Sequence, residues 1–192
     1  MKKGVKADVF RFVLKGQTLV LVDWANVYNW KNSLKWQIDS KKLYTYLLSY
    51  PEIREMLFYH GTDTNDASRK FIDEVKQVGF SVVTKPVKYL SIQEKGVTIL
   101  RRKCDFDLEI GLDCFERLEK FQSFIFFSGD GDFATLYKRL VVRKKQVIVV
   151  FAQGHLGKEI RQIKQGIYLC VVKKLAEPVS KKYPPTKGRG RD

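Results

Sequence analysis

The chain has 192 residues, 44% of them apolar, and a formal net charge of +15. This length and composition exclude a wholly disordered chain and predict one domain with a real core. No apolar run approaches the roughly 20 residues of a membrane helix, and the N-terminus lacks the apolar core of a signal peptide. We therefore expect a cytoplasmic protein with no membrane partner.

The charge comes from 36 lysines and arginines against 21 acidic residues. Such an excess favours polyanions through counterion release, with nucleic acid as the first candidate and an anionic membrane surface as the second. Solubility is the blander explanation, but a much smaller net charge would be enough for it.

Cysteine and histidine are scarce. The three cysteines are odd in number and form no CxxC pair, so neither a disulfide framework nor a zinc finger is indicated. The chain has only two histidines. Any metal should therefore be held by oxygen atoms.

The two ends of the chain are predicted to lie outside the domain. Residues 1–16 are basic without clear periodicity, and we interpret them as an N-terminal arm that adds a strand or a short helix. Residues 173–192 are rich in lysine, arginine, proline and glycine, which predicts a disordered basic tail. The domain itself then covers residues 17–172.

Within the domain, apolar runs alternate with segments of helical periodicity. Strands are predicted at 18–22, 56–60, 80–84, 124–127, 146–151 and 167–172, and helices at about 40–50, 65–79, 106–120, 134–143 and 156–164. This alternation is typical of right-handed βαβ units. The predicted fold is a single Rossmann-like α/β domain of three layers, with a mainly parallel sheet of five to six strands.

Residues 85–103 break the alternation. We expect a hairpin-like excursion above the sheet that turns at Gly96, with basic residues around the single acid Glu94. Basic residues interleaved with an aromatic suit contact with a phosphate backbone, although a solvated loop explains them equally well. The residues proposed to contact nucleic acid here are Lys88, Arg101, Arg102 and Lys103.

Acidic residues follow two of the predicted strands. Asp23 ends the run 18–22, and Asp130 and Asp132 follow the run 124–127 in a glycine-spaced turn. Taken singly, Asp23 is as well explained as a strand-end turn residue, Asn26 as a helix cap, and the acidic stretch 129–132 as a turn with an aspartate capping a helix. If the first strand pairs with the fourth where the strand order reverses, these side chains meet at the ligand-binding edge of the sheet.

A third acid comes from the helix at 106–120. A helical wheel places an apolar stripe toward the sheet, made by Leu108, Gly111, Leu112, Phe115 and Leu118, with Glu109, Asp113, Glu116 and Lys120 opposite. Asp107 falls within that stripe at the first turn. Crowded carboxylates raise one another's pKa unless a cation neutralises them, so the pattern predicts a hard oxygen-bound ion, Mg²⁺ or Mn²⁺.

Three motifs in this order resemble the NYN domain family, a PIN-like group of nucleases that includes LabA-like bacterial proteins. They are Val22-Asp23-Trp24-Ala25-Asn26, Lys103-Cys104-Asp105-Phe106-Asp107-Leu108-Glu109-Ile110-Gly111-Leu112-Asp113, and Phe127-Ser128-Gly129-Asp130-Gly131-Asp132-Phe133. The resemblance implies a PIN-like fold and a metal-dependent ribonuclease that cuts single-stranded or structured RNA to leave a 5′-phosphate and a 3′-hydroxyl.

By that resemblance, the metal-binding acids are Asp23, Asp107, Asp130 and Asp132. Asn26 is implied to hold the site or touch the phosphate, and Ser128 to form a hydrogen bond in the same pocket. DNA remains an alternative substrate. The sequence does not fix the oligomeric state, and a homodimer is one possibility.

Some positions match the family pattern loosely. Trp24 stands where the family usually has a small residue, which predicts a narrower entrance or a stacking surface. Asp105 and Asp107 compete for one family position, and the register of the following residues favours Asp107. The family often has an acid where Asp113 lies, but the helical wheel turns Asp113 outward. The aromatic residues Tyr28, Trp30 and Trp36 are predicted to belong to the core rather than to stack bases.

Two other classes of protein are weighed against the enzyme. An RNA-binding module without turnover would keep the fold, but a pure binder gains nothing from carboxylates facing phosphates. A Toprim-like site would need a glutamate where Asp23 stands, and a haloacid-dehalogenase phosphatase would need an aspartate in place of Ala25.

Overall fold

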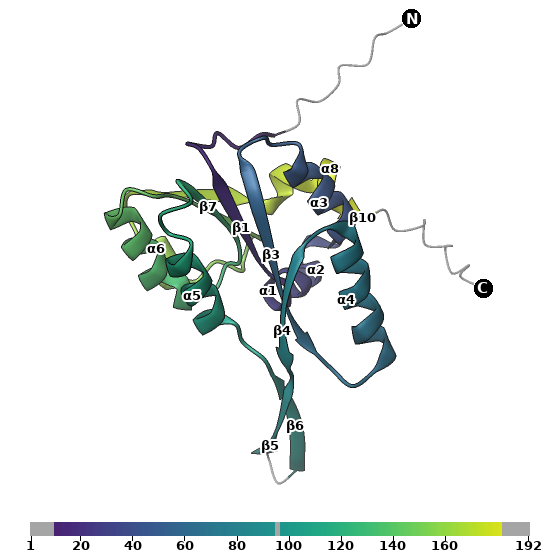
Figure 1. The fold of residues 1–192 in the computed structure, drawn as a ribbon. Coiled ribbons are helices and arrows are strands. Elements are labelled where there is room, and N and C mark those ends of the chain that lie inside the picture. The colour runs from purple at the N-terminus through teal and green to yellow at the C-terminus, as the bar shows by residue number, and fades with distance from the viewer. Residues whose placement is uncertain (1–9, 95–96, 182–192) are drawn as a thin grey trace, which may run out of the picture.

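The computed structural model describes residues 10–94 and 97–181. Its centre is a six-stranded sheet in the order β4-β3-β1-β7-β8-β9 (Figure 1). Every neighbouring pair in this sheet is parallel, as predicted. The strands are β1 (Thr18–Asp23), β3 (Ile53–Thr62), β4 (Ser81–Pro86), β7 (Ser123–Phe127), β8 (Gln146–Phe151) and β9 (Ile167–Val171).

The strand order reverses between β1 and β7. Val22 of β1 is opposite Phe58 of β3 on one side and Phe127 of β7 on the other. The first five residues of β1 are buried, which explains why its sequence has no polar break. The condition on which the meeting of the acids depended, pairing of the first and fourth predicted strands, is therefore met, and their carboxyl ends lie side by side.

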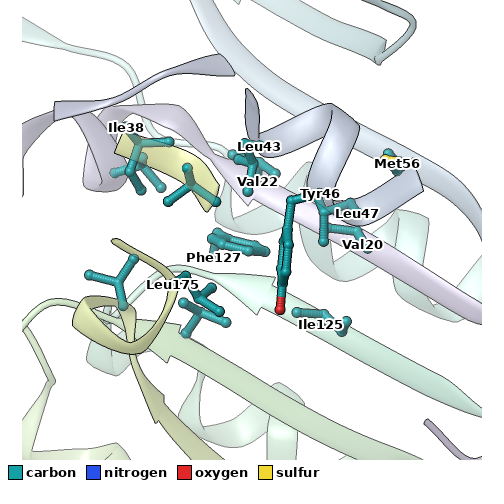
Figure 2. Close-up of a cluster of buried hydrophobic side chains, with 14 of the residues drawn as sticks. Val20, Val22, Ile38, Leu43, Tyr46, Leu47, Met56, Ile125, Phe127 and Leu175 are labelled. Carbon is teal, nitrogen blue, oxygen red and sulfur yellow. The ribbon is translucent and has the colours of Figure 1, made fainter. Parts of the chain in front are cut away.

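Helices cover both faces of the sheet (Figure 1). Odd and even positions of β1 point to opposite faces, so Val20 and Val22 enter one core cluster and Leu19 and Leu21 the other. Figure 2 shows the first cluster, where Val22 and Phe127 meet Leu43 and Leu47. Its helices are α1 (Trp24–Asn29), α3 (Ser40–Leu48) and α4 (Asp66–Val78), with the short α2 (Lys31–Leu34) after α1. The second cluster is covered by α5 (Asp107–Glu116), α6 (Ala134–Val142) and α7 (Lys158–Arg161).

The predicted disordered tail begins too early. The chain continues through η2 (Val172–Leu175) and α8 (Ala176–Val179) into β10 (Ser180–Lys181), which pairs with β2 (Gln37–Ile38). Leu175 and Val179 are fully buried in the first core cluster. These two apolar residues, four positions apart, anchor the segment. The lysines around them led to the prediction of a disordered tail. The rest of the predicted tail, 182–192, lies outside the described residues.

The part of the N-terminal arm that is described, 10–16, forms neither strand nor helix. Phe12 is 8% exposed and packs against the rings of Tyr46 and Tyr50. The backbone N–H of Lys15 donates to Ser123 Oγ at 3.1 Å. This stretch belongs to the folded body rather than to a free arm, and residues 1–9 lie outside the described residues.

Helix α5 buries a different face from the one predicted. Ile110 and Cys114 point into the core, whereas Leu108, Leu112 and Phe115 are 70%, 54% and 38% exposed. The helix is apolar on two sides, and the wheel selected the side with more leucines. The side of α5 that is buried follows from Phe106, which precedes the helix and whose ring packs against Tyr59.

Asp113 does not point outward either. Its Oδ2 accepts a hydrogen bond from Tyr59 Oη at 2.8 Å, and its Oδ1 lies 2.6 Å from Arg117 Nη1. Arg117 in turn contacts Glu55 Oε1 at 2.8 Å. Asp113 is therefore part of an ion-pair network that ties α5 to β3.

The excursion at 85–103 is confirmed as a hairpin. Strands β5 (Lys88–Glu94) and β6 (Val97–Lys103) form an antiparallel ribbon that projects from the body, continuing from the end of β4 (Figure 1). The predicted turn at Gly96 lies outside the described residues. Because β4 is parallel to β1 and β7, the ribbon leaves the same edge of the sheet at which Asp23 and Asp130 lie.

Candidate metal centre

Asp23 ends β1 and caps helix α1. Its Oδ1 accepts from the backbone N–H of Asn26 at 3.3 Å, and its Oδ2 accepts from Ser128 Oγ at 3.2 Å. Burial raises the pKa of Asp23 to about 6, against the opposing effect of these two hydrogen bonds, and the charge of Asp130 adds to the rise. The predicted site residue Asp23 is thus also the cap of α1, a role that sequence reasoning gave to Asn26.

The loop after β7 brings the second acid to the first. Ser128 is 2% exposed, and its hydroxyl accepts from the backbone N–H of Asp130 at 3.2 Å while donating to Asp23. Asp130 Oδ1 accepts from the backbone N–H of Asp132 at 3.1 Å, which starts η1 (Gly131–Phe133). One serine hydroxyl therefore links the ends of two neighbouring strands.

Asn26 holds this loop from the other side. Its Oδ1 accepts from the backbone N–H of Gly129 at 3.1 Å and from Trp30 Nε1 at 2.9 Å. Trp30 is fully buried, so its prediction as a core residue is confirmed. Its hydrogen bond to Asn26 was not foreseen, although the four-residue spacing between the two on a helix was a usable signal.

Close contacts surround the glycines of the acidic turn, with backbone at Gly129 and with a side chain at Gly131. A Cβ at Gly129 would lie 1.7 Å from the carbonyl oxygen of His155, and one at Gly131 would lie 2.2 Å from Glu159 Oε2. The backbone N–H of Gly157 donates to the carbonyl of Gly129 at 2.8 Å. The loop after β8 therefore presses on the acidic turn, a contact that sequence reasoning missed.

Asp107 approaches the same group from the start of α5. Burial raises its pKa to about 6, and nearby negative charges raise it further, in decreasing order those of Asp130, Asp105, Asp132 and Asp23. Asp105 itself is exposed and has Lys103 Nζ 3.9 Å from its Oδ2. The electrostatic coupling thus joins Asp107 to the other three predicted acids.

Within the described ranges, none of Asp23, Asp107, Asp130 and Asp132 forms an ion pair with a lysine, arginine or histidine. Nor do three Asp, Glu, His or Cys side chains of those ranges stand together as a ready-made metal cage. The donors are all oxygen, and Mg²⁺ usually keeps several waters while binding only one or two carboxylates. The residues therefore fit a hydrated hard cation rather than a closed protein cage.

Trp24 faces away from this site. It is 4% exposed, and its ring packs on Phe58 and stacks on Phe71. It also lines a groove of about 720 Å³ between α3 and α4. The prediction that Trp24 offers a stacking surface at the site entrance is therefore wrong.

The other two aromatic residues predicted to belong to the core are less buried than expected. Tyr28 is 44% exposed, with Lys31 Nζ 3.4 Å from its ring centroid. Trp36 is only partly buried against the core.

The basic residues of the ribbon are divided between its two faces. Opposite residues of an antiparallel pair share a face, so Lys88, Arg101 and Lys103 lie on one side and Arg102 on the other with Tyr89. Asp63 accepts from Tyr89 Oη at 2.5 Å and lies 3.9 Å from Arg102 Nε. At the ribbon base, Lys85 Nζ contacts Glu109 Oε1 of α5 at 2.7 Å.

These strand ends, acids and loops define an α/β domain of the PIN-like nuclease type. The NYN domain family model matches residues 17–169, so the chain belongs to the NYN domain family. No helix in the described part of the chain is both long and apolar enough to span a membrane.

The chain is also similar to a further protein and to a solved structure. The chain is 28% identical over 144 residues to the low amplitude and bright protein LabA of Synechococcus elongatus, covering 74% of this chain and 77% of that protein. It also resembles the crystal structure of a Vibrio parahaemolyticus protein of unknown function, with a TM-score of 0.63 and 24% identity, over 83% of this chain and 96% of the other. At that identity the structural likeness shows the fold alone.

Proposed function

We propose that this protein is a metal-dependent ribonuclease that hydrolyses phosphodiester bonds at the carboxylates Asp23, Asp107, Asp130 and Asp132. The observation that carries the proposal is that Asp23 and Asp130 end neighbouring strands at the point where the strand order reverses and are linked by the Ser128 hydroxyl. Asp107 is close enough for their charges to raise its pKa. Ligands of open α/β sheets bind at this point. Four coupled carboxylates without a protein cation favour a bound Mg²⁺ or Mn²⁺.

Asp23 and Asp130 would hold the ion from neighbouring strands, and Asp107 from α5. A bound divalent cation lowers the pKa of a water and stabilises charge on the phosphate oxygens. Asp132 is exposed beside Asp130, where its carboxylate would orient the attacking water. Asn26 and Ser128 would fix Asp23 and the backbone of Gly129, so that the acids need little rearrangement when substrate binds.

RNA is proposed as the substrate on the basis of family and charge. The net charge of +15 favours a polyanion, and the basic ribbon leaves the sheet edge that carries the acids. Lys88, Arg102 and Lys103 lie on the rungs nearest the ribbon base and would contact phosphates away from the scissile bond. Such contacts position a strand without reading its sequence.

The alternative is an RNA-binding module of the same fold without turnover. It is favoured by the absence of a ready-made metal cage in the described segments. Against it stands the repulsion between four uncompensated carboxylates and a phosphate backbone, which a binder would have no reason to keep.

The deciding experiment measures cleavage of labelled single-stranded RNA and DNA with Mg²⁺, Mn²⁺ or EDTA. We expect wild type to cut RNA only with metal, and Asp130→Asn to bind RNA but cut it at least ~100-fold more slowly, beyond the roughly 10- to 100-fold typical of outer-shell residues. Asp66→Asn is the matched control, because Asp66 is 80% exposed on α4. If wild type and Asp130→Asn bind alike and neither cuts, the binding module is correct. If wild type cuts DNA in preference to RNA, the proposed substrate is wrong but the proposed catalytic site is retained.

A further inference from the structure

The β5–β6 ribbon is an apolar surface without a cover. Every residue of β6 and every residue of β5 except Ile92 is exposed. Register places Leu90, Ile92, Val97 and Ile99 on one face, between Lys88, Arg101 and Lys103 toward the ribbon base and Glu94 toward its tip. A two-stranded ribbon in water is marginally stable at best. Four aliphatic side chains on one face of such a ribbon indicate that another surface packs on it.

A second uncovered surface lies on the helix that follows the ribbon. Leu108, Leu112 and Phe115 are spaced by four and three residues, so they form one stripe along α5, and all three are exposed. Gly111 lies beside this stripe with open space where a Cβ would be, which allows close approach. A stripe of this kind fits an apolar partner of similar length.

Charge decides what that partner is. The α5 stripe is flanked by the exposed Glu116, whose Oε2 lies 3.5 Å from Arg117 Nη1, and followed by the exposed Glu119; the Arg143 guanidinium lies 5.2 Å from the Phe115 ring centroid at its end. The ribbon face carries Arg101, which has no ion-pair partner among the described residues, together with Lys88 and Lys103. Packing α5 on a second α5 would bring acids together, and packing ribbon on ribbon would bring basic residues together. Only ribbon on α5 matches both the apolar side chains and the charges.

The two surfaces are also close in space. Only three residues separate the end of β6 at Lys103 from the start of α5 at Asp107, and the Lys85–Glu109 ion pair holds the ribbon base against the helix. Two reciprocal contacts around one two-fold axis can therefore form together, which closes the assembly as a dimer.

We propose that this protein forms a two-fold dimer in which the ribbon face of Leu90, Ile92, Val97 and Ile99 of each copy docks on the Leu108, Leu112 and Phe115 stripe of the other. Arg101 of the ribbon then lies against Glu116 of the partner copy. The docking surfaces lie outside the carboxylate site, although the same ribbon face carries Lys88 and Lys103, which are proposed to contact RNA, so the dimer is tested by mass in solution and not by cleavage.

The test is the mass in solution of the full chain, measured by sedimentation equilibrium. Wild type should be dimeric, and Arg101→Glu and Glu116→Arg should each weaken the dimer at least ~10-fold, since each creates like-charge contacts at both interfaces. An equimolar mixture of the two variants should recover the dimer, because both contacts are then of opposite charge. Failure of the mixture to do so would overturn the pairing.

A matched pair of variants tests the apolar contact. Leu112→Ser should lower dimer affinity by at least ~10-fold, whereas Leu48→Ser, at a leucine 60% exposed on α3, should not change it. Circular dichroism checks that both variants are folded.

Two outcomes would reject the dimer. One is a wild type that stays monomeric while Arg101→Glu only weakens RNA binding, which would make the ribbon an RNA contact alone. The other is an unchanged mass for all the variants. A dimer that cuts no nucleic acid would reject only the proposed activity.

Discussion

The carboxylate site and the β5–β6 ribbon lie at the same edge of the sheet, but the site is held by buried neighbours whereas the ribbon is exposed. The site residues follow buried strands and are interlocked through Ser128, Asn26 and a backbone contact from Gly157. The ribbon is exposed along both strands and is tied down at its base by Asp63 and by Lys85. The comparison teaches that substitutions at the site should disturb fold and chemistry together, whereas substitutions on the ribbon should change dimer formation or RNA binding and leave the fold intact.

The largest effect is expected at Gly129. Gly129→Ala forces a methyl group to within 1.7 Å of the His155 carbonyl, so the acidic turn or the loop after β8 must shift. We expect a loss of about 3 kcal/mol in the free energy of unfolding, measured by urea denaturation, and loss of metal-dependent cleavage. Gly111→Ala is the control. Open space surrounds its Cβ in α5, so a gain of up to about 1 kcal/mol is expected. Equal stability of the two variants would contradict the close contact.

Asp23 should make the metal-free protein less stable as pH rises. Its pKa in the folded state is about 6, above the ordinary 3.8, so folding holds its proton more tightly than the unfolded chain does. The stability from Asp23 is then fully present below about pH 4 and is lost as pH rises through about 6.

Asp23→Asn removes this ionisation. In EDTA at pH 7 we expect it to raise the free energy of unfolding by about 2 kcal/mol, within the upper value of about 3 kcal/mol that the two pKa values allow, and to have little effect near pH 4. Mn²⁺ should stabilise wild type but not the variant. If the difference in unfolding free energy between wild type and Asp23→Asn did not depend on pH, burial would not raise the pKa of Asp23.

Trp30 should act on the site through Asn26. Trp30→Phe keeps a buried ring but removes the N–H that donates to Asn26 Oδ1 at 2.9 Å. We expect a fall of roughly 10-fold in the cleavage rate under saturating RNA, as for other outer-shell residues. Trp24→Phe, in the aromatic cluster with Phe58 and Phe71, loses similar volume and should leave the rate unchanged at a matched folded fraction. Equal rates for both variants would assign Trp30 to packing alone.

The smallest effect is expected at the ribbon base. Lys88→Ala and Lys103→Ala should each weaken RNA binding a few-fold, regardless of sequence, and reduce the salt slope of binding to a single strand by about 0.7. Stability should hardly change, because both residues are exposed. Lys70→Ala, exposed on α4, is the control and should leave the slope as it is. A change that depends on RNA sequence would indicate base contacts instead of phosphate contacts.

Much of the fold could be predicted because its signals are local. The strands at 18–22 and 146–150 are buried on both faces, and after Thr18 and Gln146 their sequences have no polar break, so they were recognisable without any knowledge of their neighbours. The positions of Asp23 and Asp130 after such runs, and the parallel order of the strands, followed from the same alternation. The acidic turn was visible because glycine and aspartate interrupt an apolar run abruptly.

Apart from the local hydrogen bond between Trp30 and Asn26, the main features that sequence reasoning missed depend on contacts between distant segments. Helix α5 is apolar on two sides, and the packing of Phe106 on Tyr59 selected which side is buried. The contact of Gly157 with Gly129, and the anchoring of 173–181 by Leu175, join parts of the chain that no local pattern connects. The sequence by itself determined which strands end in acids. Only the tertiary structure decided what holds those acids in place and which apolar faces remain uncovered, because burial is a property of neighbours in space rather than of neighbours along the chain.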